Sequence, residues 1–293
     1  MNALSVEEER FHFGMWAINK SPLIIGAIMD PKRLSKASVE ILENNEVIAI
    51  NQDPLGKQAQ LIRRYSEEEW DIWLGDLSGS RKVLGIANWR NDSQSAHVDL
   101  SSIGIASASA RDVWAARNLG LVSGDQNLTM AGHEMKLWIL SNITASVPLR
   151  SSGYYSVANA TLGGSTVLTA CAVDECLPTK KKAGNIGANA TISFRDVSSK
   201  FAGKKLMSVD YINYDYAFET AWDWGSNTRN MTIQVNGGPT KRWAFPISGG
   251  NWFETGSLTI EVDGFKAGVN NVVFSAAKGD LWAPDLVGFE ILE

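Results

Sequence analysis

The chain has 293 residues, of which 44% are hydrophobic and 20% are charged, so general disorder is excluded and the length suffices for roughly two or three hydrophobic cores. The formal net charge is −5, and the longest run of basic residues is Lys180–Lys182. This charge balance excludes an electrostatic surface for nucleic acid, so we expect no nucleic-acid partner. We interpret the lysine triplet as part of a solvated loop.

The N-terminal sequence and the sequons give different indications about secretion. No apolar run approaches the roughly 20 residues of a membrane-spanning helix, so we expect no membrane partner. The opening MNALSVEEER has neither the basic nor the apolar region of a signal peptide. Six Asn-x-Ser/Thr sequons beyond residue 90 nevertheless favour a secreted glycoprotein whose beginning is not in this chain. The glycosylation candidates are Asn91, Asn127, Asn142, Asn159, Asn189 and Asn230.

The first segment, residues 1–60, has the pattern of helices around one buried strand. Ser5 and Glu8 form the Ser-x-x-Glu pattern of a capping box, which predicts a helix that begins at Ser5. The apolar residues that follow recur at intervals typical of one helix face. After Pro22, the continuous apolar run LIIGAIM predicts a strand buried on both faces of a parallel sheet. A second helix begins at Ser35, and the Asp-Pro turn in NQDPLG ends the segment.

Helix, buried strand and helix form the repeat of an α/β barrel. A complete (β/α)8 barrel needs about 250 residues, so this segment holds fewer than two units. We therefore expect a barrel fragment whose apolar faces lack their partners. Asp30 follows the predicted strand, where barrel enzymes place catalytic groups. Asp-Pro also opens turns, and no second carboxylate can be placed nearby, so we interpret Asp30 as a turn residue.

The remaining two segments are predicted to be β domains. Residues 61–147 contain short alternating strands such as WDIWLGDL, KVLGIANW and HEMKLWIL, which predict an antiparallel β-sandwich domain. Residues 150–293 continue with strands such as ATISFRDV and SLTIEVDGF among more Gly and Asn, which predicts a separate jelly-roll β-sandwich. The stretch 146–153, SVPLRSSG, is interpreted as the linker.

Two cysteines, Cys171 and Cys176, lie in the short stretch CAVDEC. A local disulfide is the favoured interpretation and free thiols are the alternative, while a zinc site is not supported because no second Cys/His pair accompanies them. So short a loop contributes little loop-closure entropy.

Aromatic residues are frequent in the third segment and suggest flat platforms for sugar rings. Most Trp residues of a β-sandwich are buried, so we predict that Trp243 and Trp252 belong to the core. Trp282, in KGDLWAPD, is the candidate sugar platform because the surrounding Gly, Asp and Pro indicate a loop. The other aromatic candidates are Trp222, Trp224, Tyr211, Tyr214 and Tyr216.

The sequence lacks the residues that several classes of enzyme need for catalysis. Only three histidines are present, with no G-x-S-x-G motif, which argues against a serine hydrolase. A glycine-rich phosphate loop and an H-E-x-x-H motif are also absent from the sequence. A packing role is favoured for His12, which lies beside Phe11 and Phe13 on the first predicted helix.

Longer stretches carry a family resemblance. EEERFHFGMWAINKSPLIIG and LSKASVEILENNEVIAINQDPLG resemble the seventh helix, eighth strand and eighth helix of the catalytic barrel of family 27 α-galactosidases. VLGIANW, RDVWAARNLG and GHEMKLWIL look like the C-terminal antiparallel β domain of that family. KKAGNIGANATISF, NWFETGSLTIEV and APDLVGFEI are similar to the family 35 carbohydrate-binding module of some fungal α-galactosidases. The resemblance therefore covers nearly the whole chain.

The resemblance implies a retaining hydrolase that removes terminal α-linked galactose through two aspartates, a nucleophile and an acid/base. In the family these aspartates lie on the fourth and sixth barrel strands, upstream of anything that corresponds to residue 1. Nothing here matches the K-Y-D nucleophile motif or the N-D-P-D-M galactose-binding motif. We therefore assign no catalytic residue.

Modules of the family 35 type usually hold a structural calcium through acidic residues in their first and last strands. Here YYSVANATL lacks the early glutamates, and Val287 stands where a second aspartate is expected, which leaves only Asp285. Because Ca²⁺ takes several oxygen ligands, the sequence supports no metal site and no other cofactor.

Our main hypothesis is that the chain is the C-terminal part of a secreted α-galactosidase, from a truncated gene model or a partial sequence, and is inactive alone. The parent would act on α-galactosides or polysaccharide. The alternative is a non-catalytic carbohydrate-binding protein that uses residues 150–293. A third hypothesis is that the chain pairs with a separate chain that supplies the rest of the barrel. No oligomeric state is predicted.

Overall fold

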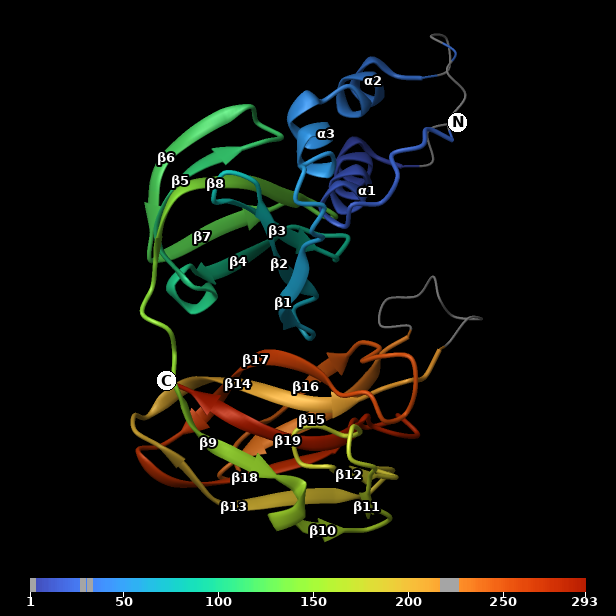
Figure 1. Ribbon diagram of the computed structural model, residues 1–293, viewed down its shortest axis with the longest axis vertical. Helices are drawn as coiled ribbons and strands as arrows, with labels where there is room; N and C mark the ends of the chain where they lie inside the picture. Colours follow the sequence, from blue (N-terminus) through green and yellow to red (C-terminus); the bar gives the residue numbers. More distant parts are fainter. Residues whose placement is uncertain (1–3, 27–29, 31–33, 217–226) are drawn as a thin grey trace. The chain divides into compact units, whose positions relative to one another are not determined.

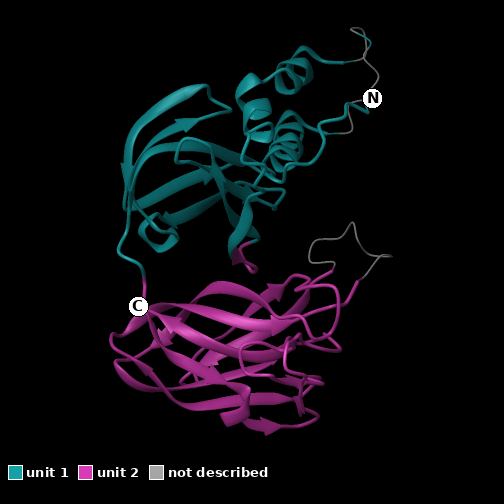
Figure 2. Ribbon diagram, viewed as in Figure 1, with its two compact units in different colours: residues 1–63, 69–148 teal, residues 64–68, 149–293 magenta. Residues whose placement is uncertain are grey.

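The computed structural model of the chain describes residues 4–26, 30, 34–216 and 227–293. Two compact units are present: unit 1 consists of residues 1–63 and 69–148, and unit 2 consists of residues 64–68 and 149–293 (Figure 2). The described helices are few and short, and the strands are antiparallel (Figure 1). The expectation of a mostly β protein with few helices is confirmed. The first two predicted segments lie together in unit 1.

Three helices form in the described residues at the start of unit 1: α1 (Val6–Ile18), α2 (Lys36–Leu42) and α3 (Asn45–Asn51). The Ser5 hydroxyl accepts a hydrogen bond from the Glu8 amide at 3.3 Å, and the Glu8 carboxylate accepts one from the Ser5 amide at 2.7 Å. These two bonds confirm the predicted capping box. Within the described chain, no helix is long and apolar enough to cross a membrane.

The predicted barrel strand does not form in its described part. Of the amides in Leu23–Gly26, only that of Ile24 donates a backbone hydrogen bond within the described chain, to the Pro22 carbonyl at 2.9 Å. The rest of the predicted strand, residues 27–29, lies outside the described residues. A strand needs a neighbouring strand to satisfy its N–H and C=O groups, and Leu23–Gly26 has none among the described elements. Asp30 accepts a backbone hydrogen bond from Leu34 at 2.9 Å, as in a turn.

The β part of unit 1 contains one large sheet and one two-stranded ribbon (Figure 1). The sheet order is β1 (Gln60–Tyr65), β2 (Trp70–Leu77), β3 (Arg81–Asn88), β8 (Met135–Ala145), β5 (Ile105–Asp112) and β6 (Arg117–Ser123). The ribbon pairs β4 (Gln94–Asp99) with β7 (Asp125–Met130). The antiparallel β character predicted for this segment is therefore confirmed.

The helices and the sheet of unit 1 share a hydrophobic core. Ile18 of α1 and Ile50 of α3 are buried in the same cluster as Leu137 of β8. The Glu46 carboxylate of α3 accepts two hydrogen bonds from the Arg111 guanidinium of β5, at 2.5 and 2.6 Å. One face of the helical segment is therefore covered by the β domain, and only the other face lacks a cover.

Asp53, just after α3, fixes the helical segment to the turn between β2 and β3. Its carboxylate accepts hydrogen bonds from the Ser78 hydroxyl at 2.8 Å, from the Ser78 amide at 3.0 Å and from the Leu55 amide at 3.1 Å. Burial alone would raise the pKa of Asp53, but these hydrogen bonds and the Lys20 ammonium outweigh it, and the pKa is lowered. The ionised carboxylate therefore stabilises this connection.

Unit 2 is a sandwich of two antiparallel sheets, as predicted (Figure 1). One sheet has the order β10 (Thr161–Gly163), β13 (Thr191–Ser199), β18 (Gly268–Ala276), β15 (Arg229–Val235) and β16 (Thr240–Phe245). The other has the order β11 (Val167–Ala170), β12 (Lys181–Gly184), β19 (Asp285–Leu292), β14 (Gly203–Ile212) and β17 (Gly256–Phe265), with β9 (Ser151–Ser156) also paired to β19.

Aromatic side chains fill the space between the two sheets of unit 2. Phe289 of β19 makes an edge contact with Phe194 of β13, at a ring-centroid distance of 4.9 Å, and lies 5.3 Å from the ring of Phe274. Trp243 is only 2% exposed, which confirms that it belongs to the core. The interior of this unit is therefore closed and apolar, as expected for an independently folding sandwich.

Candidate functional site

One end of the unit 2 sandwich is organised by a disulfide. Cys171 and Cys176 are bonded to each other, which confirms the favoured prediction. Cys176 is fully buried and packs with Ile212 and Val287, and Trp252 packs against this cluster. The Cys176 amide also donates to the Phe253 carbonyl at 2.9 Å. The disulfide loop thus holds the loop that carries the aromatic pair Trp252 and Phe253.

A buried ion pair lies at the same end. The Lys182 ammonium, on β12, is 2.8 Å from the Asp285 carboxylate at the start of β19, and their side chains are only 9% and 12% exposed. The prediction of a solvated lysine triplet is therefore wrong for Lys182. Its burial follows from strand pairing, because β12 pairs with β19 through Ala183 and Leu286. Gly184 makes room, since a Cβ there would lie 2.9 Å from an Asp285 carboxylate oxygen.

The ionisation of Asp285 reflects two opposing influences. Burial raises the pKa of the carboxyl, and the hydrogen bond and charge of Lys182 oppose that rise without cancelling it. The Lys182 ammonium also donates to the Trp252 carbonyl at 2.6 Å. Asp285 and the Trp252 loop therefore meet at one cation.

Aromatic side chains that are partly open to solvent lie on one side of this ion pair. Tyr214 and Tyr216 meet edge to face at 5.1 Å, and Tyr214 makes a similar contact with Trp252 at 6.3 Å. Trp252 is partly exposed, so its prediction as a core residue is wrong. Phe253 and Tyr216 are exposed. We call Tyr214, Tyr216, Trp252 and Phe253 the aromatic surface.

Arg229 connects the aromatic surface to the loop of Trp282. Its guanidinium lies over the Trp252 ring, 4.8 Å from the ring centroid, and pairs with the Asp215 carboxylate at 3.0 Å. It also donates to the carbonyl of Ala283, the residue after Trp282, at 3.2 Å. A cation over an indole ring is held by electrostatic attraction.

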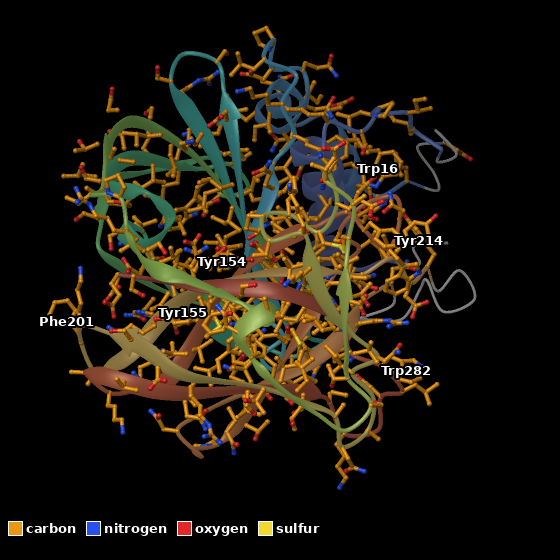
Figure 3. The ribbon with its side chains drawn as sticks, turned by 60° about the horizontal axis from the view of Figure 1, so that its bottom comes forward. Trp16, Tyr154, Tyr155, Phe201, Tyr214 and Trp282 are labelled. Carbon is orange, nitrogen blue, oxygen red and sulfur yellow. A yellow bond between two sulfur atoms is a disulfide. The ribbon has the colours of Figure 1, made fainter. Side chains whose placement is uncertain are left out.

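Trp282 lies in the loop between β18 and β19, with 44% of the residue exposed. Its ring covers Gly187, where a Cβ would lie 2.9 Å from the indole, and the Ala283 amide donates to the Ile186 carbonyl at 2.9 Å. In Figure 3, Tyr214 and Trp282 lie toward the same edge of unit 2. Trp222 and Trp224 fall outside the described residues, and Tyr211 is buried.

A separate apolar groove lies in unit 1, between α1, α2 and the extended Leu23–Gly26. We call it the α1 groove; its volume is about 410 Å³, and it is lined mostly by apolar residues. Ile24 is 82% exposed, and Trp16 is 41% exposed. The carboxylate in its lining is that of Glu9, which accepts a hydrogen bond from the Ser38 hydroxyl at 2.7 Å. His12 packs edge to face on Trp16 at 5.5 Å.

The α1 groove holds a single carboxylate among its described lining residues, whereas glycoside hydrolysis needs a pair. At the disulfide end, the Asp215 and Asp285 carboxylates are paired with Arg229 and Lys182. Likewise, the described residues contain no group of three or more His, Cys, Asp or Glu side chains that could hold a metal ion. The aromatic surface can instead offer flat apolar area beside charged and polar groups, which suits binding of a sugar ring.

The six predicted glycosylation sites differ in the exposure of their asparagine side chains. Five of the asparagines are exposed, whereas Asn230 on β15 is half-buried. The Asn230 amide donates to Asp280 at 2.8 Å, and its oxygen accepts from Arg242 at 2.8 Å. Asn230 is therefore unsuited to carry a glycan in this fold. The exposed ones are Asn91, Asn127, Asn142, Asn159 and Asn189.

Residues 67–140 match the family described as the alpha galactosidase C-terminal beta sandwich domain. The whole chain is similar to the probable alpha-galactosidase D of Aspergillus niger, with 29% identity over 402 residues that cover 100% of this chain and 61% of the relative. The probable alpha-galactosidase D of Neosartorya fischeri is 30% identical over 99% of this chain and 60% of its own length. The chain thus spans about three fifths of the length of these curated relatives.

Among solved structures, the family 35 carbohydrate-binding module from Clostridium thermocellum is 26% identical, with a TM-score of 0.42, and the match covers 48% of this chain and 99% of that one. The predicted resemblance to the C-terminal part of family 27 glycoside hydrolases is confirmed by the matched domain and the α-galactosidase relatives.

Proposed function

We infer that the chain is the C-terminal portion of an α-galactosidase, because residues 67–140 match the family of alpha galactosidase C-terminal β-sandwich domains. Such an enzyme hydrolyses terminal α-linked galactose with retention of configuration. The observation that carries the proposal is this matched domain, within an alignment of the whole chain to α-galactosidases. The relatives are longer than the chain, and the resemblance assigns both catalytic aspartates to the part that it does not span.

The α1 groove supports this proposal. Ile24 and Trp16 expose apolar surface that isolated domains normally cover, and Leu23–Gly26 has no strand neighbour among the described elements. Further strands and helices of a barrel would cover both. The chain alone is therefore proposed to be inactive, since a retaining mechanism requires two carboxyl groups about 5 to 5.5 Å apart. Binding alone does not supply the roughly 8 kcal/mol or more by which enzymes lower reaction barriers.

The test compares two proteins on an aryl α-galactoside. One is this chain, and the other is the chain preceded by the sequence read from the genomic DNA upstream of Met1. We expect turnover only from the longer protein. An upstream region without an in-frame K-Y-D motif, or a longer protein that shows no turnover, would contradict the proposal. Turnover by the chain alone would contradict its proposed inactivity.

A second candidate function, non-catalytic binding of polysaccharide, is favoured by the exposed aromatic residues of unit 2. Trp282 and the aromatic surface lie near Arg229, whose guanidinium contacts both regions. Aromatic rings stack on the apolar face of sugars, while nearby polar groups bind hydroxyls. Unit 2 would then serve as a binding module, whether or not a catalytic barrel accompanies it.

Retention on an insoluble polysaccharide tests this second function. Trp282→Ala should reduce the retained fraction several-fold. Phe201→Ala is the matched control, because Phe201 is also an exposed aromatic residue of unit 2 but lies on its opposite side in Figure 3. Equal retention of the Trp282→Ala variant and the unaltered chain would remove Trp282 from the proposed site.

Secretion is proposed from the sequons. The five exposed asparagines offer their side chains to solvent, whereas Asn230 has both polar atoms of its amide engaged. When the chain is expressed in a secreting eukaryotic host with an added signal peptide, glycosidase treatment should lower its apparent mass. Asn189→Gln should remove one glycan, and Asn230→Gln should remove none. An unchanged mass after glycosidase treatment would overturn the proposal.

A further inference from the structure

Lys182 and Asp285 are two opposite charges that are buried together in unit 2. Both side chains are more than four-fifths buried, although lysine and aspartate are rarely buried without a specific partner. Breaking such a pair leaves an uncompensated charge in an apolar region. At a separation of 2.8 Å, the two side chains neutralise each other's charge, and only protein groups take part.

The ammonium of Lys182 joins three separate elements of unit 2. It lies on β12, contacts the Asp285 carboxylate of β19, and donates to the Trp252 carbonyl in the loop between β16 and β17. It also lies over the Phe253 ring, 4.6 Å from the centroid, and 6.0 Å from that of Trp252. An ammonium has three donors, and these oxygens and ring faces take them up.

A divalent cation does not fit these surroundings. Calcium takes six to eight oxygen ligands. Here Val287 is fully buried and packs on Ile212 and the disulfide. Within the described residues, no three acidic or metal-binding side chains come together. The nearby Asp215 carboxylate is paired with Arg229. Among the described residues of this region, those that could have served a metal are therefore apolar or already paired.

We propose that Lys182 is a built-in cation of unit 2, which joins β12, β19 and the Trp252 loop and makes the fold and the aromatic surface independent of divalent metal. The charge that a metal would bring comes from a covalently attached ammonium. Lys182 is in this sense a positioning residue for Trp252 and Phe253, since its ammonium binds the Trp252 carbonyl and lies over both rings. The proposal concerns the folding of unit 2 and does not require the hydrolase proposed above.

Thermal unfolding of the full chain tests the proposal. The melting temperature of unit 2, followed by near-ultraviolet circular dichroism, should be the same in EDTA and in millimolar CaCl₂. Lys182→Met should lower that temperature by roughly 10 °C, because it leaves Asp285 buried without its partner. Lys181→Met is the matched control: Lys181 is an exposed neighbour on the same strand, and its replacement should have no measurable effect.

A double variant separates loss of charge pairing from loss of packing. Lys182→Met combined with Asp285→Leu removes both charges, so it should recover part of the lost melting temperature. Titration with CaCl₂ should give no binding heat with the unaltered chain. A fall in the melting temperature of the unaltered chain in EDTA, reversed by calcium, would overturn the proposal even if no Lys182 variant folds. A Lys182→Met variant as stable as the unaltered chain would overturn it as well.

Discussion

The helical segment of unit 1 and the disulfide end of unit 2 differ in whether their side chains have partners within the chain. In the helical segment, Ile24 and Trp16 leave apolar surface open around the α1 groove, and Leu23–Gly26 remains without a strand neighbour among the described residues. At the disulfide end, the buried charges Lys182 and Asp285 satisfy each other. The helical segment therefore leaves apolar surface exposed, whereas unit 2 pairs its buried charges within itself.

The largest effect is expected in unit 2, where a substitution tests whether the interior is closed to solvent. Trp243→Ala removes a large side chain that is only 2% exposed, so it should lower the free energy of unfolding of unit 2 by about 3 to 5 kcal/mol. Urea unfolding followed by far-ultraviolet circular dichroism measures this loss. Phe201→Ala, at an exposed position of the same unit, serves as the control. A Trp243→Ala loss below about 1 kcal/mol would indicate that the interior is not closed.

A smaller effect is expected where the helical segment is attached to the β domain. Asp53→Asn removes an ionised acceptor of the Ser78 and Leu55 hydrogen bonds and should lower the stability of unit 1 by about 1 to 3 kcal/mol at neutral pH. The pKa of Asp53 is lowered in the folded state, so its contribution is present above the unfolded pKa of about 3.9 and is lost as the pH falls through the folded pKa.

Urea unfolding at pH 7 and at pH 3 measures that dependence. The difference between the Asp53→Asn variant and the unaltered chain should be largest at pH 7 and should shrink at pH 3. A difference that stays constant between the two pH values would show that the carboxylate charge plays no part in the attachment.

The smallest effect is expected at the α1 groove, where a substitution tests whether the groove is uncovered. Ile24→Ser should change the free energy of unfolding by no more than about 0.5 kcal/mol, because the side chain is 82% exposed. Ile18→Ser is the control, since Ile18 is fully buried in the core of unit 1. A loss above about 1 kcal/mol for Ile24→Ser would mean that the groove is already covered.

Local sequence patterns predicted many elements of the fold well. The alternating stretch WDIWLGDL became β2, Trp70–Leu77, because alternation fixes which side chains face the core. The Ser5 capping box and the Cys171–Cys176 disulfide also depend on groups close together in sequence. Leu23–Gly26 does not form the predicted strand in this structure, because a strand depends on a neighbour, which no local pattern contains.

The candidate site was predicted only in part, for the same reason. Trp282 was correctly placed in an exposed loop from its neighbours Gly, Asp and Pro. Lys182 looked like a solvated lysine, and its burial depends on the pairing of Ala183 with Leu286 across about a hundred residues of sequence. Arg229 offered no local signal, because its role comes from contacts with Trp252 and the Trp282 loop. Partners distant in sequence therefore determine most of the site.

Hydrogen exchange of the chain, followed by mass spectrometry, tests the central contrast most directly. Peptides that contain Leu23–Gly26 should exchange at nearly the rate of an unstructured chain, because these residues lack strand partners within the described chain. Peptides from β19, Asp285–Leu292, should remain protected until unit 2 unfolds. Strong protection of Leu23–Gly26 in the chain alone, or rapid exchange in β19, would contradict this contrast between an uncovered helical segment and a closed unit 2.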